Sequence, residues 1–585
     1  MNNRIKLFLA LILMIGTKVY AQDFETATDA VKNMGVGWNL GNTLDANGQK
    51  ITDVSNSSYW GQQGVDSETY WGQPVTKPEL LKMMKEAGFG AIRVPVTWYN
   101  HMDKDGNVDA AWMKRVHEVV DYVINQGMYC IINVHHDTGA DSDNFKSWIK
   151  ADEDNYNTNK ARYEKLWKQI AEEFKDYGQL LLFESYNEML DKLSSWCYAS
   201  FAATGQYNAT VAESAYKGIN NYAKSFVETV RKSGGNNDKR NLIVNTYGAC
   251  NGSGTWKTYL KDPLKNLSLP ESESNHIAVE VHGYPNIENG LSNAKSDLDD
   301  MFKALNTYFV SKGTPVIIGE WGTSNVDKGA GKTDYDLRKN TMFEFVDYWV
   351  KTAKDLGIAT FYWMGLSDGA FRDAPAFNQA DLAERIVKAY HGDSYSGQYP
   401  TASIEYIVKY TSEWSEAFLY GDWGNNTIKV SDYKGIRVEM DKTYGDKLQI
   451  KIYGDKDGKN TDGSDKYKTQ EVKLSSSSNT TTVDFDATAL GSTIPRITLQ
   501  TLSGTQTVRI KSANLIKKDG TEVDGNITVA WGCEVNGETV TSTGITSVIT
   551  KGSWSNDKIY NLQGQEVQIP QKGIYIKNGK KYIAK

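Results

Sequence analysis

A short apolar run near the N-terminus ends in polar residues and glycine: VGWNLGNTLD, residues 36–45. Similar runs recur along the chain and start at Ala91, Tyr129, Leu180, Leu242, Ile277, Pro315 and Thr360. Helical patterns lie between them, at 78–87, 110–126, 162–174 and 337–356. Short apolar strands that alternate with helices indicate βα units and a parallel sheet. Eight such strands predict an α/β fold, a (β/α)8 TIM barrel, over residues 25–395.

The character of the sequence changes after residue 391. Residues 392–400 are polar and rich in turn formers, and alternating strand-like runs follow at 428–430, 436–440, 448–452 and 497–502 without a helical pattern. Such runs predict an all-β sandwich module over 401–548. Four aromatic residues near its start are consistent with either glycan binding or core packing: Trp414, Phe418, Tyr420 and Trp423. A short C-terminal β segment, 556–585, has strand-like pieces at 559–562 and 573–576.

The N-terminus predicts an exported protein. Two basic residues, Arg4 and Lys6, precede an apolar run over residues 7–15 and the sequence VYA before Gln22. This is the pattern of a cleavable signal peptide, residues 1–21, because a membrane span needs about 20 apolar residues. We expect a secreted, extracellular or cell-surface monomer with no membrane span in the mature chain. Its four cysteines are too scattered for their pairing to be deduced.

The overall charge argues against nucleic acid as a partner. The formal net charge is −7, so the chain has no broad positive field for phosphate backbones. A neutral substrate is the better expectation.

Polar and aromatic residues stand at the ends of the predicted strands, where a (β/α)8 barrel places its active site. They are Asn39, Arg93, His135, His136, Asn187, Glu188, His282, Tyr284, Glu320, Trp321 and Trp363. Cleavage of a glycosidic bond needs one protonated carboxyl and one carboxylate, and aromatic rings offer flat faces to sugars. We therefore expect Glu188 and Glu320 to be catalytic and the other residues to bind substrate. Two further strand carboxyls, Glu184 and Glu280, do not stand at strand tips and are expected to be structural.

A metal site is the alternative for His135, His136 and Asp137. A catalytic zinc ion normally needs three well-placed protein ligands, and the chain has no HExxH or similar spacing. We expect neither a metal nor an organic cofactor.

The order and wording of these motifs resemble glycoside hydrolase family 5. The matching pieces are VGWNLGNTLD (36–45), RVPVTW (93–98), NVHH (133–136), NE (187–188), HGY (282–284), GEW (319–321) and Trp363. The resemblance covers roughly residues 30–390 and is strongest to the endoglucanase subgroup. It implies that Glu188 is the acid/base and Glu320 the nucleophile. One departure is Met189, where the family often has proline after the acid/base.

The resemblance implies a secreted retaining endo-β-1,4-glucanase whose partner is a β-glucan polysaccharide. The alternatives are a xyloglucanase, lichenase, xylanase or mannanase of the same fold, or a non-catalytic surface glycan-binding protein. Residues 559–565 and 572–577 resemble sorting domains of the type nine secretion machinery. That resemblance implies that the C-terminal segment is an address for export.

Overall fold

The computed structural model describes residues 24–47, 63–139, 141, 147–191, 207–253, 258–271, 274–287, 289–323, 332–422, 427–541, 559–560, 573–577 and 580–584. The signal peptide, Cys197, Trp423 and most of the C-terminal sorting segment lie outside these residues. So do Trp60, Trp196 and Trp256, whose positions in predicted loops or at strand ends make them candidates for a sugar-binding cleft. Residues Val540–Lys585 form a unit separate from Met1–Thr539.

Eight parallel strands close into a barrel in sequence order, because β1 pairs with both β2 and β8. They are β1 (Val36–Asn39), β2 (Ala91–Val94), β3 (Tyr129–Asn133), β4 (Leu181–Glu184), β5 (Leu242–Asn245), β6 (Ile277–Gly283), β7 (Val316–Trp321) and β8 (Ala359–Tyr362). Five begin at the predicted residue, and β4, β7 and β8 begin one residue away. The predicted TIM barrel is confirmed.

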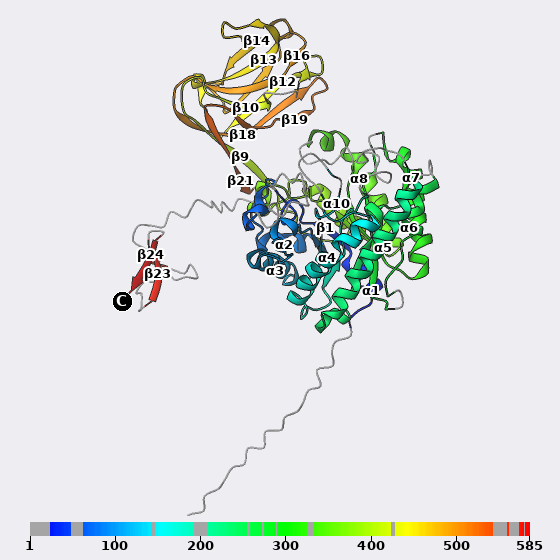
Figure 1. Ribbon diagram of the computed structural model, residues 1–585. Coiled ribbons are helices and arrows are strands. Elements are labelled where there is room, and N and C mark those ends of the chain that lie inside the picture. Colours follow the sequence, from blue (N-terminus) through cyan, green and yellow to red (C-terminus); the bar gives the residue numbers. More distant parts are fainter. Residues whose placement is uncertain are drawn as a thin grey trace, which may run out of the picture. The chain divides into compact units, whose positions relative to one another are not determined.

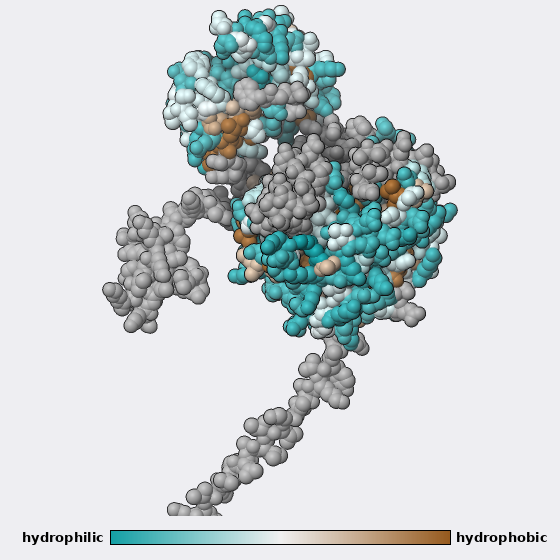
Figure 2. All heavy atoms as spheres, in the orientation of Figure 1, coloured by the Kyte–Doolittle hydropathy of each residue, from teal (hydrophilic) through white to brown (hydrophobic). Residues whose placement is uncertain are grey.

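Helices cover the outside of the barrel (Figure 1). They are α2 (Pro78–Ala87), α3 (Ala110–Ile124), α4 (Glu153–Glu173), α5 (Ala209–Lys232), α6 (Asp262–Lys265), α7 (Leu291–Tyr308), α8 (Lys332–Asp355), α9 (Ala370–Asp373) and α10 (Ala380–His391). Each long helix turns apolar residues inward, and the visible barrel face around α4 and α5 is mainly hydrophilic (Figure 2). Among the described helices, none is long and apolar enough to cross a membrane.

A small helix covers the end of the barrel at which the strands begin. This helix, α1 (Ala27–Met34), donates a backbone hydrogen bond from Ala27 to Asn275, two residues before β6. Its apolar face joins the side chains inside this end of the barrel, including Ile131 and Ile317. The opposite end, where the strands finish, is therefore the one that can hold a site.

Residues 402–541 form two antiparallel sheets around their own apolar core. One sheet has the order β14-β13-β17-β10-β20, and the other has the order β15-β12-β18-β9-β21, with β19 beside β18. The strands are β9 (Ala402–Tyr410), β10 (Glu416–Gly421), β12 (Tyr433–Met440), β13 (Leu448–Lys459), β14 (Asp465–Lys473), β15 (Thr480–Asp484), β17 (Arg496–Thr501), β18 (Gln506–Lys517), β19 (Glu522–Asp524), β20 (Thr528–Trp531) and β21 (Cys533–Thr541), with a small pair β11 (Ile428–Lys429) and β16 (Thr493–Ile494). The antiparallel β module is confirmed.

The expectation that this module lacks helix is wrong in one place. A single turn, α11 (Ala487–Leu490), forms because the Asp486 side chain accepts hydrogen bonds from the backbone N–H groups of Thr488 and Ala489. The aromatic cluster near the start of the module divides, since Trp414 is 53% exposed and Phe418 is buried. Phe418 therefore packs inside the module, whereas Trp414 presents its ring to solvent.

The C-terminal unit contains three antiparallel strands, β22 (Ile559–Tyr560), β23 (Gly573–Lys577) and β24 (Lys580–Ala584). The strands β22 and β23 lie at the two strand-like pieces of the sequence, whereas β24 was not predicted.

Three cysteines fall within the described residues. Cys130, Cys250 and Cys533 are free thiols.

Candidate active site

Arg93, the third residue of β2, is a fully buried cation at the centre of the polar end of the barrel. Its guanidinium donates two hydrogen bonds to Glu184, from Nε at 2.7 Å and from Nη2 at 2.8 Å. The other three N–H groups donate to Asn39 Oδ1 (3.0 Å), Glu320 Oε1 (2.8 Å) and Asn187 Oδ1 (2.7 Å). Burial penalises the charge, but the carboxylates, Glu184 first, outweigh this penalty and raise the pKa of Arg93. Arg93 therefore fixes the position of Glu320.

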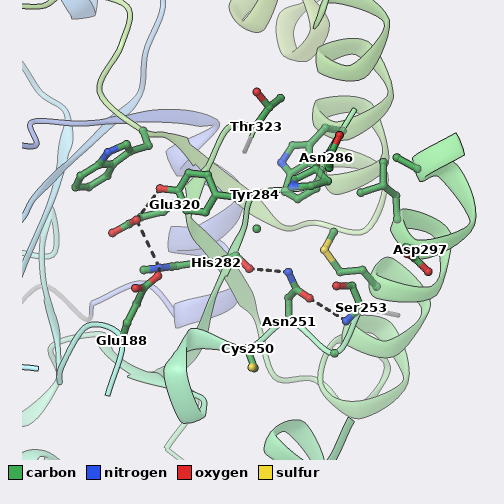
Figure 3. Close-up of a pocket in the computed structure, with 18 of the residues that line it drawn as sticks. Glu188, Cys250, Asn251, Ser253, His282, Tyr284, Asn286, Asp297, Glu320 and Thr323 are labelled. Carbon is green, nitrogen blue, oxygen red and sulfur yellow. Dashed lines mark hydrogen bonds and ion pairs between the residues drawn. The ribbon is translucent and has the colours of Figure 1, made fainter. Parts of the chain in front are cut away.

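The two glutamates predicted to be catalytic face one another (Figure 3). Glu320, in β7, accepts a hydrogen bond from Arg93 at Oε1 and from the Tyr284 hydroxyl at Oε2, the latter at 2.7 Å. Glu188 follows β4, and its side chain is 25% exposed. An oxygen of Glu188, an oxygen of Glu320 and a nitrogen of His282 all lie within 4.8 Å of one another. Both carboxyl groups therefore reach the same small volume.

His282 connects Glu188 and Glu320 to the buried Glu280. Its Nδ1 lies 2.8 Å from Glu188 Oε1 and 3.6 Å from Glu320 Oε2, and its Nε2 lies 3.1 Å from Glu280 Oε1. Burial opposes a charged ring, but the carboxyls of Glu320, Glu188 and Glu280 raise the pKa of His282 to about 10. The ring is therefore an imidazolium at neutral pH, and it donates one N–H to Glu188 and the other to Glu280.

Glu184 and Glu280 form a buried carboxyl pair beneath Glu188 and Glu320. Burial and the charge of Glu184 raise the pKa of Glu280 to about 8, against the opposing effect of Arg93. Glu184 is equally buried, but its two bonds from Arg93 and a hydrogen bond from Glu280 lower its pKa. Burial and the neighbouring charge therefore favour the protonated form of Glu280, whereas Arg93 favours the charged form of Glu184. Gly319 leaves room for this group, because a Cβ there would lie 1.8 Å from Glu280 Oε1.

Both histidines after β3 line the pocket. His135 is buried, which lowers its pKa, and the Asn133 amide lies 3.0 Å from its Nδ1. The His135 ring is parallel to that of Trp363, with ring centres 6.0 Å apart. The more exposed His136 has its Nε2 3.7 Å from Asp45 Oδ2. Both imidazoles therefore line the pocket, whereas the sequence alone did not show which of the two faces it.

Three of the predicted site residues lie behind the pocket wall. Asn39 and Trp321 are fully buried, as is Arg93. Asn39 accepts from Arg93 and donates to the Gly319 carbonyl at 2.9 Å, so it links β1, β2 and β7. Trp321 packs on Trp349, with ring centres 5.7 Å apart. These residues hold Glu320 in place from behind.

The pocket has a volume of about 1000 Å³. Eight predicted site residues line it: His135, His136, Asn187, Glu188, His282, Tyr284, Glu320 and Trp363. The sequence interpretation missed other lining residues, including Asn42, Asn251, Asn286, Asn293, Asp297 and Thr323, which come from loops and from α7. No lysine or arginine is among the described lining residues. The surface is therefore suited to a neutral ligand rich in hydroxyl groups.

Trp71, Trp98 and Trp148, which lie in predicted loops or at strand ends, are further candidates for the cleft. Trp71 is 38% exposed, and its ring centre lies 5.1 Å from that of His136, beside the pocket. Trp98 and Trp148 are buried in the barrel core instead.

The possible metal ligands differ from the triplet suggested by the sequence. Asp137 is used within the protein, since its carboxylate accepts from the backbone N–H groups of Trp98 and Tyr99. The third possible ligand beside the two histidines is instead Asp45. Ligand atoms of Asp45, His135 and His136 lie within 4.8 Å of one another. A second group, Glu188, His282 and Glu320, has the same spacing. The positive charge of His282 makes that ring a poor ligand, since coordination requires a neutral imidazole.

The barrel also matches known proteins. A family model described as Cellulase (glycosyl hydrolase family 5) matches residues 44–368. A GH5-4 broad specificity endoglucanase from an uncultured bacterium is 69% identical; the match covers 64% of this chain and 98% of that chain, with a TM-score of 0.60. PbGH5A from Prevotella bryantii B14, a mutant in complex with a xyloglucan tetradecasaccharide, is 41% identical; the match covers 63% of this chain and 99% of that chain, with a TM-score of 0.53. The cellulase/esterase CelE of Acetivibrio thermocellus is 34% identical over 400 residues, which are 66% of this chain but only 42% of CelE.

Proposed function

Since this chain belongs to glycosyl hydrolase family 5, we propose that it is a retaining endo-β-1,4-glucanase that cleaves internal bonds of β-glucans, xyloglucan included. The observation that carries this proposal is the position of Glu188 and Glu320. Retaining enzymes hold their two carboxyl groups about 5–5.5 Å apart, whereas inverting enzymes need about 6.5–9.5 Å to admit water. Oxygens of the two glutamates within 4.8 Å of each other favour retention.

The geometry supports a double displacement. Glu188 gives its proton to the glycosidic oxygen while Glu320 attacks the anomeric carbon, so the bond to the leaving sugar breaks and a glycosyl ester forms. The His282 imidazolium stabilises the carboxylate that Glu188 becomes. Water then gives a proton to Glu188, and its oxygen displaces Glu320. Arg93 and Tyr284 stabilise the Glu320 carboxylate as it leaves.

The pocket and the relatives support a neutral β-glucan as the substrate. The described pocket lining lacks a basic residue that would favour an acidic polysaccharide. The similar endoglucanase is of broad specificity, and the Prevotella enzyme binds a xyloglucan oligosaccharide. Mixed-linkage glucan, xylan and mannan are the alternative substrates. A non-catalytic glycan-binding role is disfavoured because both carboxyls are present and have oxygens within 4.8 Å of each other.

We also propose that the protein is exported and acts outside the cell or on its surface. The signal pattern of residues 1–21 and the sorting-like C-terminal segment support this proposal. N-terminal sequencing of the secreted protein should begin near Gln22, and a full-length cytoplasmic product would contradict it.

The proposed reaction is tested by NMR of the first products released from a β-1,4-glucan oligosaccharide. The β-anomer should appear first, and product lengths from a polymer should fall through intermediate sizes. If the α-anomer appears first, the mechanism is inverting and the proposal is wrong. If cellulose-derived glucans, mixed-linkage glucan and xyloglucan all remain intact, the substrate assignment is wrong.

A further inference from the structure

Arg372 is a buried cation that joins two loops of the pocket. It lies in the short helix α9, which follows β8, and its side chain is buried. Its guanidinium donates from Nε to the Ser367 carbonyl at 2.7 Å and from Nη1 to the Gly41 carbonyl at 2.9 Å. Its Nη2 makes a longer contact, 3.5 Å, to the Met364 carbonyl. Since Ser367 and Met364 belong to the loop after β8 and Gly41 to the loop after β1, Arg372 ties these two loops together.

The charge of Arg372 is held for the shape of its guanidinium. Burial lowers the pKa of Arg372 to about 10, although the charges of Asp368 and Asp45 oppose the shift. The three contacts described above go to backbone carbonyls, and the guanidinium lies over the Trp38 ring, 4.9 Å from its centre. A lysine could not do the same, because its single ammonium group lacks the planar fork that reaches both loops and stacks on an indole.

The two loops meet at Trp363, which lines the pocket. The Trp363 ring packs against Gly41, since a Cβ at Gly41 would lie 2.9 Å from Trp363 Cη2. The next residue, Met364, has a φ of 29°, in the left-handed region that long side chains rarely adopt. Such a conformation persists only where the surrounding structure holds it. The position of the Trp363 ring therefore depends on the two loops that Arg372 joins.

We propose that Arg372 is a positioning residue, which holds the Trp363 ring, through the loops after β1 and β8, in the orientation that stacks on the sugar. This inference rests on the proposed function and adds to it a residue behind the pocket wall. Because the Arg372 side chain is buried, it acts on a bound sugar only through the groups that it holds. A ring that is already in place loses little freedom when the sugar binds, so fixing it strengthens binding of both substrate and transition state.

Arg240 offers a matched control at the other end of the barrel. It is also buried, it lies over the Phe183 ring at 4.8 Å, and it donates mainly to backbone carbonyls, among them that of Leu181 at 2.7 Å. It stands two residues before β5, at the end where the strands begin, so it is far from the pocket. Arg240→Lys should therefore weaken the fold as Arg372→Lys does, without moving Trp363.

The test is a double-mutant cycle on kcat/KM, measured with a β-1,4-glucan oligosaccharide well below the melting temperature of every variant. Arg372→Lys should lower kcat/KM by about tenfold or more, because the stacking ring is misplaced. In a Trp363→Ala background the same substitution should change kcat/KM by less than about twofold, because the ring on which Arg372 acts is gone. Arg372→Lys and Arg240→Lys should both lower the melting temperature, but Arg240→Lys should leave kcat/KM within about twofold of the wild type.

The outcomes separate a positioning role from a merely structural one. Equal losses from Arg372→Lys in the two backgrounds, an equal loss from Arg240→Lys, or no loss at all overturns the inference. If Arg372→Lys does not fold, Gly41→Ala takes its place in the cycle, because the added Cβ displaces the Trp363 ring from its contact with this loop. Its loss should also vanish in the Trp363→Ala background, and a loss that persists there overturns the inference. Wild-type protein that cleaves no β-glucan contradicts the proposed function and this inference with it, whereas the other outcomes concern Arg372 alone.

Discussion

Replacing Glu280 by glutamine probes the charges behind the candidate catalytic carboxyls, Glu188 and Glu320. Glu280 is fully buried, accepts from His282 Nε2 and lies against Glu184, and its pKa is raised to about 8. This shift favours the protonated, uncharged form of Glu280. Glutamine has nearly the same shape: its carbonyl can accept from His282 and its amide can donate to Glu184. The substitution should be tolerated, unlike most changes to a buried carboxyl.

The magnitude follows from the pKa difference. The ordinary pKa of 4.5 applies to Glu280 in the unfolded chain, and about 8 applies in the folded protein. A carboxyl whose pKa is raised by folding contributes stability that is complete below the unfolded pKa and is lost as the pH rises through the folded pKa. At about 1.4 kcal/mol per pKa unit, the wild type should lose about 3 kcal/mol of unfolding free energy between about pH 5.5 and about pH 8. Glutamine does not titrate, so Glu280→Gln should not show this loss. The pKa of His282 is raised to about 10. Because His282 titrates in both proteins, its contribution largely cancels from the difference between their unfolding free energies.

Urea unfolding at the two pH values, with loss of activity as the signal, measures this difference in unfolding free energy. At the lower pH the unfolding free energy of the variant should be within about 1 kcal/mol of that of the wild type. At the higher pH, the unfolding free energy of the variant relative to the wild type should be larger by about 3 kcal/mol. Glu184→Gln is the matched control, since it removes the partner of two Arg93 hydrogen bonds and should cost about 3–5 kcal/mol at both pH values. The reasoning is refuted if Glu280→Gln is as destabilised as the control at low pH, or if its pH dependence matches that of the wild type.

Three further predictions concern the reaction. Glu320→Gln should lower kcat by at least about a thousandfold, because the nucleophile is lost, while calorimetry should show nearly unchanged glycan affinity; turnover close to wild type would contradict the assignment. Tyr284→Phe removes the 2.7 Å hydrogen bond to Glu320 and should lower kcat by about ten- to a hundredfold with little change in melting temperature; an unchanged kcat would show that the bond is not needed in the reaction. Dialysis against a chelator should leave turnover unchanged, whereas a loss restored by zinc alone would point to a metal at Asp45, His135 and His136.

The barrel strands could be found in the sequence because they are buried on both faces. Each then appears as a continuous apolar run, which contrasts with the helices around it. Helix ends were harder to place where the first turns are polar. The sequence of α4 starts with EDNYNTNKA, and its buried residues begin only at Tyr163, so the apolar period predicted a start at 162 instead of Glu153. The helices α5, α7 and α10 were not singled out at all.

The candidate site was largely predictable because barrel topology brings the ends of all strands to one rim. That rule placed Glu188 and Glu320 together from the fourth and seventh strands. It could not tell which side chains reach the pocket and which stay behind it, because that depends on packing. Asn39, Arg93 and Trp321 are at the predicted positions, yet they are buried supports of Glu320.

The sequence by itself determined the eight-stranded barrel, the β module after it and the two glutamates of the candidate catalytic pair. These features depend on local hydrophobic periodicity and on strand order, which are written along the chain. Only the tertiary structure decided that the pKa of Glu280 is raised while that of Glu184 is lowered, that neighbouring carboxyls raise the pKa of His282, and that residues of α7 line the pocket. These features depend on distances between residues far apart in sequence and on the removal of water around them, because burial and neighbouring charges set protonation only once the strands have closed.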